Sequence, residues 1–167
     1  GATNTAETPT GMLSGNVSST IAGGQGNTTN GAEDHILGGQ SNQTNGYSRA
    51  SGKSNTTSNY GTIGGGENNT NPNDSTATTI SGGSNNQTSA EYSTVSGGNN
   101  NITWGPYSTI SGGWNNFIPA HGFSYGTIAG GESNQADANY AVISGGIDNE
   151  VSGDYSTVSG GSANIAT

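Results

Sequence analysis

Apolar positions recur along this chain with a period of about 15 residues. The steps between them run from 13 residues, between Ala50 and Ile63, to 18 residues, between Ile110 and Ile128. A short, sustained period of this kind is typical of stacked coils, in which each repeat is one winding of the chain. The ten recurring positions are Ile21, Ile36, Ala50, Ile63, Ile80, Val95, Ile110, Ile128, Ile143 and Val158.

Each repeat is a variant of Tyr-Ser-Thr-Ile-Ser-Gly-Gly-x-x-Asn, which is clearest in residues 92–101 and 107–116. Counting from the apolar residue as zero, small residues stand at −2, mostly Thr at −1, and Gly-Gly at +2 and +3 in nine repeats. Position −3 holds all seven tyrosines: Tyr47, Tyr60, Tyr92, Tyr107, Tyr125, Tyr140 and Tyr155. Position +6 holds nine asparagines: Asn27, Asn42, Asn69, Asn86, Asn101, Asn116, Asn134, Asn149 and Asn164.

These columns predict how one coil is built. Side chains alternate faces along a strand, so −2 and 0 point inward while −3 and −1 form an outer surface of Tyr and Thr. Gly-Gly ends the strand at a tight corner, and a second short strand follows near +8. We expect Asn at +6 to suit the next corner, because it tolerates left-handed backbone and bonds to main chain or to its copy one coil away.

The pattern therefore predicts an all-β, parallel β-solenoid of about ten coils and two short strands per coil over residues 18–167. Residues 1–17 do not match the repeat, and we expect them to be a cap, a linker or a strand that pairs with another subunit. Two coils are enlarged, over 70–77 and 117–124, and should form outward loops.

Composition limits the functional classes. The chain has 167 residues, 26% of them hydrophobic, and a formal net charge of −9, with Arg49 and Lys53 as its only Lys or Arg residues. This balance argues against nucleic-acid partners, which need a basic face. No apolar run approaches the ~20 residues of a spanning helix, so we expect no direct membrane insertion.

The stretches 92–97 and 155–160, which read Tyr-Ser-Thr-Val-Ser-Gly, resemble the head repeats of trimeric autotransporter adhesins of the YadA type. The Ser at the second position and the Gly at the sixth position match the family motif. The bulky apolar residues of the family motif stand one position to either side of Val95 and Val158. The Gly-Gly-x-x-Asn motif also resembles repeats of bacterial and phage surface fibres. The resemblance implies a left-handed β-roll, a trimer and a place on the cell surface.

Catalytic signals are weak, and we expect no enzyme, metal site or cofactor. His35 replaces Thr at −1, and the Gly-Gly pairs lack the Lys and helix of phosphate loops. Four Asn-x-Ser/Thr sequons lie off the +6 column and are candidate glycosylation sites, namely Asn16, Asn55, Asn68 and Asn73. Four residues form a candidate ligand patch: Trp104, Trp114, Phe117 and His121.

These observations favour a non-catalytic, extracellular structural or adhesion module of a surface fibre. Two alternatives stay open: a filament subunit joined end to end through the solenoid edges and residues 1–17, and a repeat module of a phage tail fibre. The expected partners are further copies of the chain, as a trimer or filament, and a glycan or a host-surface or matrix protein.

Overall fold

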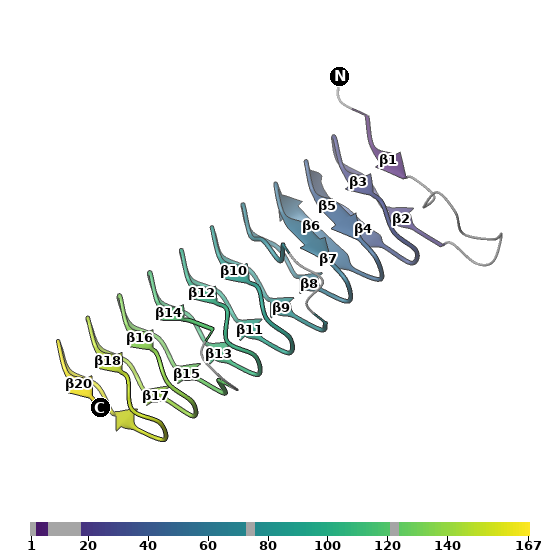
Figure 1. The fold of residues 1–167 in the computed structure, drawn as a ribbon. Helices are drawn as coiled ribbons and strands as arrows, with labels where there is room; N and C mark the ends of the chain where they lie inside the picture. The colour runs from purple at the N-terminus through teal and green to yellow at the C-terminus, as the bar shows by residue number, and fades with distance from the viewer. Residues whose placement is uncertain (1–2, 7–17, 73–75, 121–123) are drawn as a thin grey trace.

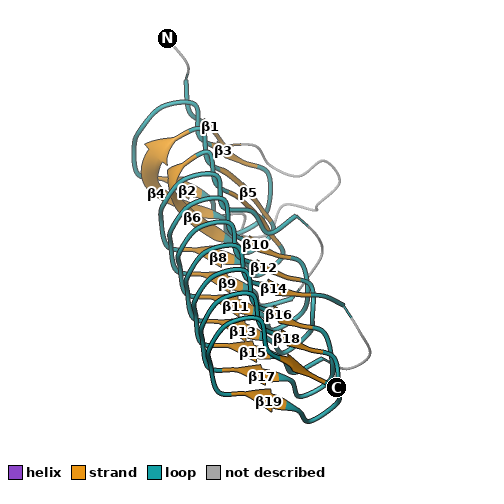
Figure 2. Ribbon diagram, turned by 90° about the vertical axis from the view of Figure 1, so that its left-hand side faces the viewer, coloured by secondary structure: helices purple, strands orange, loops and turns teal. Residues whose placement is uncertain are grey.

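The computed structural model describes residues 3–6, 18–72, 76–120 and 124–167, and these form a parallel β-solenoid (Figure 1). The fold class predicted from the periodicity is confirmed. Successive windings stack along one axis, so residues about 15 positions apart lie side by side (Figure 2). In the described part of the chain, no helix is long and apolar enough to cross a membrane.

The first side of the solenoid is a ten-stranded parallel sheet with one strand per coil. Each strand is short, and most contain only positions −1 and 0 of the repeat. In chain order they are β2 (Thr20–Ile21), β4 (His35–Gln40), β6 (Arg49–Lys53), β8 (Thr62–Ile63), β9 (Thr79–Ile80), β11 (Thr94–Val95), β13 (Thr109–Ile110), β15 (Thr127–Ile128), β17 (Val142–Ile143) and β19 (Thr157–Val158).

The second side contains the strands at +7 and +8, which form one sheet of four strands and one of six. Thr70 lies between the two sheets and links them through single β-bridges to Thr56 and Gln87. A third line of bridges at +4, which the periodicity did not reveal, runs from Gln25 to Ser162. The strands of the second side are β1 (Thr5–Ala6), β3 (Thr28–Thr29), β5 (Gln43–Asn45), β7 (Thr56–Ser58), β10 (Gln87–Thr88), β12 (Ile102–Thr103), β14 (Phe117–Ile118), β16 (Gln135–Ala136), β18 (Glu150–Val151) and β20 (Ile165–Ala166).

The narrow interior is filled by positions −2, 0 and +8. Between coils the apolar residues at 0 stack directly, and Ile80, Val95 and Ile110 are completely buried. Position +8 changes character along the solenoid. It is Thr in the N-terminal coils except at Asn71, and the hydroxyls of Thr29, Thr44, Thr57 and Thr88 have no hydrogen-bond partner among the described residues. It is apolar further on, as at Ile118, Ala136 and Val151.

The asparagines at +6 form a continuous ladder that is buried from Asn27 to Asn149 and exposed at its two ends. Each Oδ1 accepts a hydrogen bond from the backbone N–H of the next ladder Asn, over 2.8–3.1 Å, from Asn4 through Asn27 to Asn164. Each Nδ2 of the interior coils donates to a glycine-corner carbonyl of its own coil and to one of the next. For Asn101 these are Gly97 and Gly113, both at 3.0 Å.

The expectation that Asn at +6 takes up the left-handed turn is wrong. The positive φ belongs to the preceding residue, as at Asn85, Asn100 and Asn115. The ladder Asn instead turns its side chain inward and replaces main-chain hydrogen bonds at the corner. The glycine at +3 is required for close approach, since a Cβ on Gly98 would lie 2.2 Å from the Gly113 carbonyl oxygen.

The coil at Ala50 is one glycine short, and this shifts its numbering. Gly52 pairs with Gly39 and Lys53 pairs with Gln40, so Gly52 is the second glycine of the corner and the first is missing. Asn55 therefore stands on the Asn ladder, although counting from Ala50 placed it off the column.

The N-terminal segment also contributes to the solenoid. Strand β1 pairs with β3 of the same chain, and Asn4 Oδ1 accepts from the Asn27 N–H. Asn4, Thr5 and Ala6 thus occupy positions +6 to +8 of one incomplete coil. The solenoid domain predicted to begin at residue 18 leaves this incomplete coil out. The described residues 3–6 add this incomplete coil to the solenoid, and the three roles proposed for residues 1–17 stay predictions; residues 1–2 and 7–17 lie outside the described part.

We predict that Asn101→Ala destabilises the protein by about 3 kcal/mol. It leaves the Asn116 N–H and the Gly97 carbonyl without their partner and removes one of the two donors to the Gly113 carbonyl, which keeps the Asn99 N–H. Each buried unsatisfied group costs about 1–3 kcal/mol. Denaturant unfolding followed by circular dichroism measures the loss.

The adjacent substitution Asn100→Gly is the control. Asn100 has φ of 57° and its side chain makes a surface hydrogen bond to Asn115, so glycine fits its backbone and little is lost. An Asn101→Ala variant as stable as Asn100→Gly would contradict the structural role of the ladder.

Candidate functional site

The tyrosine column is the most regular aromatic surface of the molecule. Tyr92, Tyr107, Tyr125, Tyr140 and Tyr155 form one continuous stack with ring centroids 4.8–5.1 Å apart and interplanar angles of 1–11°. Tyr47 and Tyr60 form a separate stacked pair. Ala77 occupies the column between the two stacks.

The tyrosines lie outside the strands, contrary to the prediction that −3 and −1 share one strand face. Each has a φ of 55–60°, in the left-handed region that bulky residues rarely adopt. The N–H of each links the turn to the coil before it, as Tyr107 does with the Glu91 carbonyl. Ring stacking contributes about 0.5–1.5 kcal/mol per pair and offsets part of the backbone strain.

The stack presents ring edges rather than ring faces. Because neighbouring rings are nearly parallel, each interior ring covers the faces of the next, and 38–50% of Tyr92, Tyr107, Tyr125 and Tyr140 stays exposed. The adjoining columns at −1 and +1 over 77–159 contain only Thr, Ser, Ala and Val. These columns are therefore uncharged over this half of the sheet, although the chain carries a net charge of −9 and Glu91 and Asp154 directly precede two of the tyrosines.

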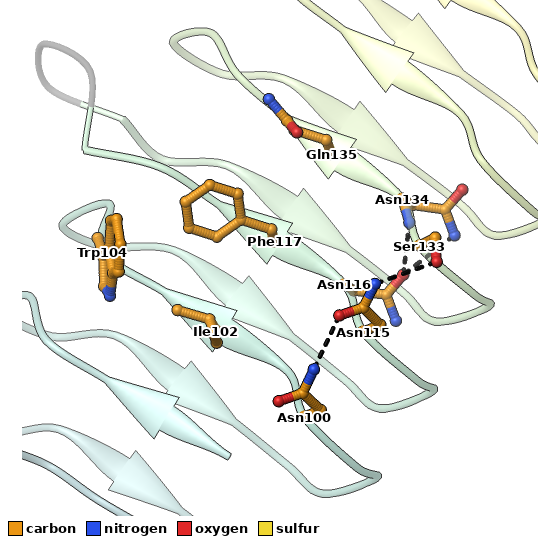
Figure 3. Close-up of a pocket in the computed structure, with 9 residues that line it drawn as sticks. All are labelled: Asn100, Ile102, Trp104, Asn115, Asn116, Phe117, Ser133, Asn134 and Gln135. Atoms are coloured by element: carbon orange, nitrogen blue, oxygen red, sulfur yellow. Dashed lines mark hydrogen bonds between the residues drawn. The ribbon is translucent and has the colours of Figure 1, made fainter. Parts of the chain in front are cut away.

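Trp104 and Phe117 come together on the opposite side of the solenoid. Their rings meet edge to face with centroids 5.0 Å apart, and Trp104 is 42% exposed. They border a surface hollow of about 390 Å³, shown in Figure 3. Its other walls are Ile102 and Gln135 on one side and the polar corner residues Asn100, Asn115, Asn116, Ser133 and Asn134 on the other. A second hollow, of about 380 Å³, lies between Trp104, Gln87, Ser89 and Ala120.

The structure does not bring the whole expected ligand patch together. Trp114 is 51% exposed but stands on the line of bridges at +4, between Asn99 and Glu132, and does not border the hollow at Trp104. His121 lies outside the described residues. The patch is thus reduced to Trp104 and Phe117, with Ile102 and the corner amides added.

The four candidate glycosylation sites also differ in where they lie in the structure. Asn55 is completely buried as part of the Asn ladder, where Oδ1 and Nδ2 both make hydrogen bonds, and this burial argues against Asn55 as a glycan carrier. Asn68 is exposed in a left-handed turn, with φ of 55°. Asn16 and Asn73 lie outside the described residues.

A third surface, which the sequence reasoning missed, gathers the charged substitutions of the −3 and −1 columns. Glu33, His35 and Arg49 border a hollow of about 300 Å³ together with Tyr47, Tyr60 and Thr62. The sequence pattern that could have revealed this surface is that His35 and Arg49 replace Thr at position −1 in successive coils. In the described part of the chain, no group of three or more His, Cys, Asp or Glu residues could hold a metal ion.

We predict that, in a host that attaches N-linked glycans, Asn68 is modified and Asn55 is not. The buried Asn55 amide holds the corner together, whereas the Asn68 side chain is accessible. Peptide mass spectrometry of both sites measures the occupancy. Modification of Asn55 in folded protein would contradict its buried position, and Asn68→Gln serves as the control for the assigned site.

Comparisons with known proteins leave the molecule without a family assignment. No protein-family model matches the chain, and no curated protein matches it in sequence. We therefore infer function from the solenoid and the three surfaces described above.

Proposed function

We propose that this chain is a non-catalytic, extracellular module of a surface fibre that joins copies of itself side by side and adheres to glycans. The in-register stacking of every coil supports this proposal, because parallel hydrogen-bond ladders on several sides make a solenoid a stiff scaffold. Its surfaces are repetitive and shallow, which suits many weak contacts that add together. The resemblance to trimeric adhesin heads points the same way.

The tyrosine column, with the uncharged columns at −1 and +1 beside it, is the surface we propose for self-association. Two copies of a chain with net charge −9 repel each other unless they meet through a neutral face. The five-ring stack from Tyr92 to Tyr155 supplies such a face, and its outward ring edges and hydroxyls combine apolar area with hydrogen-bonding groups. We therefore expect a second copy of this chain to bind at the tyrosine stack.

Light scattering tests this self-association. We predict a mass that is a multiple of the 16.5 kDa chain and that falls towards one chain in the double variant Tyr107→Ser, Tyr125→Ser. Ser fits the backbone at these positions, because Ser124 and Ser133 already adopt a positive φ. A mass of one chain at all concentrations would rule out a fibre built by this face.

The hollow beside Trp104 is the surface we propose for glycan adhesion. Its lining combines an exposed indole, a phenyl ring and an aliphatic side chain with the solvent-accessible amides of Asn100, Asn115 and Gln135. Aromatic rings offer apolar area to the C–H faces of sugars, and amides can both donate to and accept from sugar hydroxyls. The lining residues carry no charge, so neutral sugars are the ligand class that fits.

We predict that Trp104→Ala lowers binding to neutral glycans by about tenfold or more, since a central aromatic contact carries much of the energy of a small interface. A glycan array followed by titration of the strongest ligand measures this. Trp114→Ala is the matched control, because Trp114 is similarly exposed but does not line the hollow. Equal losses in the two variants, or no neutral ligand at all, would refute this surface.

A further inference from the structure

Arg49 occupies an unusual position in the N-terminal coils. It pairs with His35 across strands β4 and β6, and both side chains point to the outer face that Thr occupies in most other coils. Beside them stand the stacked rings of Tyr47 and Tyr60. With Thr62 and Glu33, these groups border a single hollow of about 300 Å³.

The charge of Arg49 is not neutralised in the described part of the chain. The other cation, Lys53, forms an ion pair with Glu67 at 2.6 Å. Arg49 has no ion pair and no side-chain hydrogen bond to any described residue, although Glu33 borders the same hollow. A free guanidinium presents a planar fork of N–H donors that matches a carboxylate.

The remaining groups around Arg49 suit a ligand with many hydroxyls. Tyr47, Tyr60 and Thr62 each contribute a hydroxyl that both donates and accepts, and His35 adds ring nitrogens. Glu33 can accept from a ligand hydroxyl but repels a second carboxylate. The hollow is open and near the lower end of small-ligand sites in volume, which suits a sugar unit rather than a folded peptide segment.

We infer that this hollow, defined by Glu33, His35, Tyr47, Arg49, Tyr60 and Thr62, binds a carboxylate-bearing sugar of the uronic-acid class. The carboxylate lies against Arg49, and the sugar hydroxyls contact the tyrosines, Thr62 and Glu33. This inference goes beyond the proposed function, because it needs neither self-association nor the hollow beside Trp104. It assigns an acidic ligand to a chain that is itself strongly acidic.

The test is an NMR titration of the isotope-labelled full chain with D-glucuronate, with D-glucose as the matched neutral probe. We expect glucuronate to shift the backbone amides of 33–36, 47–50 and 60–62, and glucose to leave them unchanged. Arg49→Gln should weaken glucuronate binding at least about fivefold, whereas Lys53→Gln, which removes the other cation, should not. Glu33→Gln should strengthen binding about two- to fivefold by removing a like charge.

Four results would overturn the inference: absence of glucuronate shifts at these amides, equal shifts with glucose, equal loss in Arg49→Gln and Lys53→Gln, or stronger shifts with an acetylated tetraglutamate peptide than with glucuronate. The last would assign the hollow to an acidic protein partner. None of these outcomes depends on Trp104, and a failure here leaves the proposed fibre function in place. The spectra of the variants outside residues 33–62 show whether the fold is intact.

Discussion

The buried asparagine ladder is the interaction on which the rest of the structure depends. At each corner the chain must bend sharply, and the bend leaves carbonyls and amides that the strands cannot satisfy. One Asn side chain per coil supplies both the acceptor and the donor that are needed there, and it ties each coil to its neighbour. With so few apolar residues in the chain, these directional bonds fix the register that hydrophobic packing alone would leave loose.

The fold could be predicted because the interior demands the same residue types in every coil. Ile110 and Ser108 must be buried and Gly113 must lie close to the next coil, so the sequence repeats these features. Other details left no such trace. Nothing about Tyr favours a left-handed turn; the turn itself sets the positive φ, since Glu33 and Ala77 adopt it at the same position without a ring to stack. A missing glycine near Gly52 shifted the count by one and hid the true place of Asn55.

The surfaces were harder to predict than the interior, because they depend on which columns meet in space. Trp104 and Phe117 differ in repeat position and meet only because the coil of Phe117 lies beside that of Trp104. Trp114 is nearer to Phe117 in sequence and yet faces elsewhere. His35 and Arg49 could have been paired from the sequence by reading down the −1 column, since the register places them in adjacent strands. Packing does not constrain an exposed column of the repeat. Residues that depart from the usual type in such a column are therefore a better guide to a binding surface than the residues that follow it.

Each junction between coils uses the same bonds, and this has a consequence for how such a molecule can change in length. Gain or loss of one whole winding creates no new kind of contact, because the flanking windings meet as any two neighbours do. A partial winding must either bulge outward or be absorbed locally, as the shortened corner at Gly52 shows. Duplication in units of one turn is therefore the cheapest route to a longer or shorter rod, and reach can vary while the cross-section stays constant.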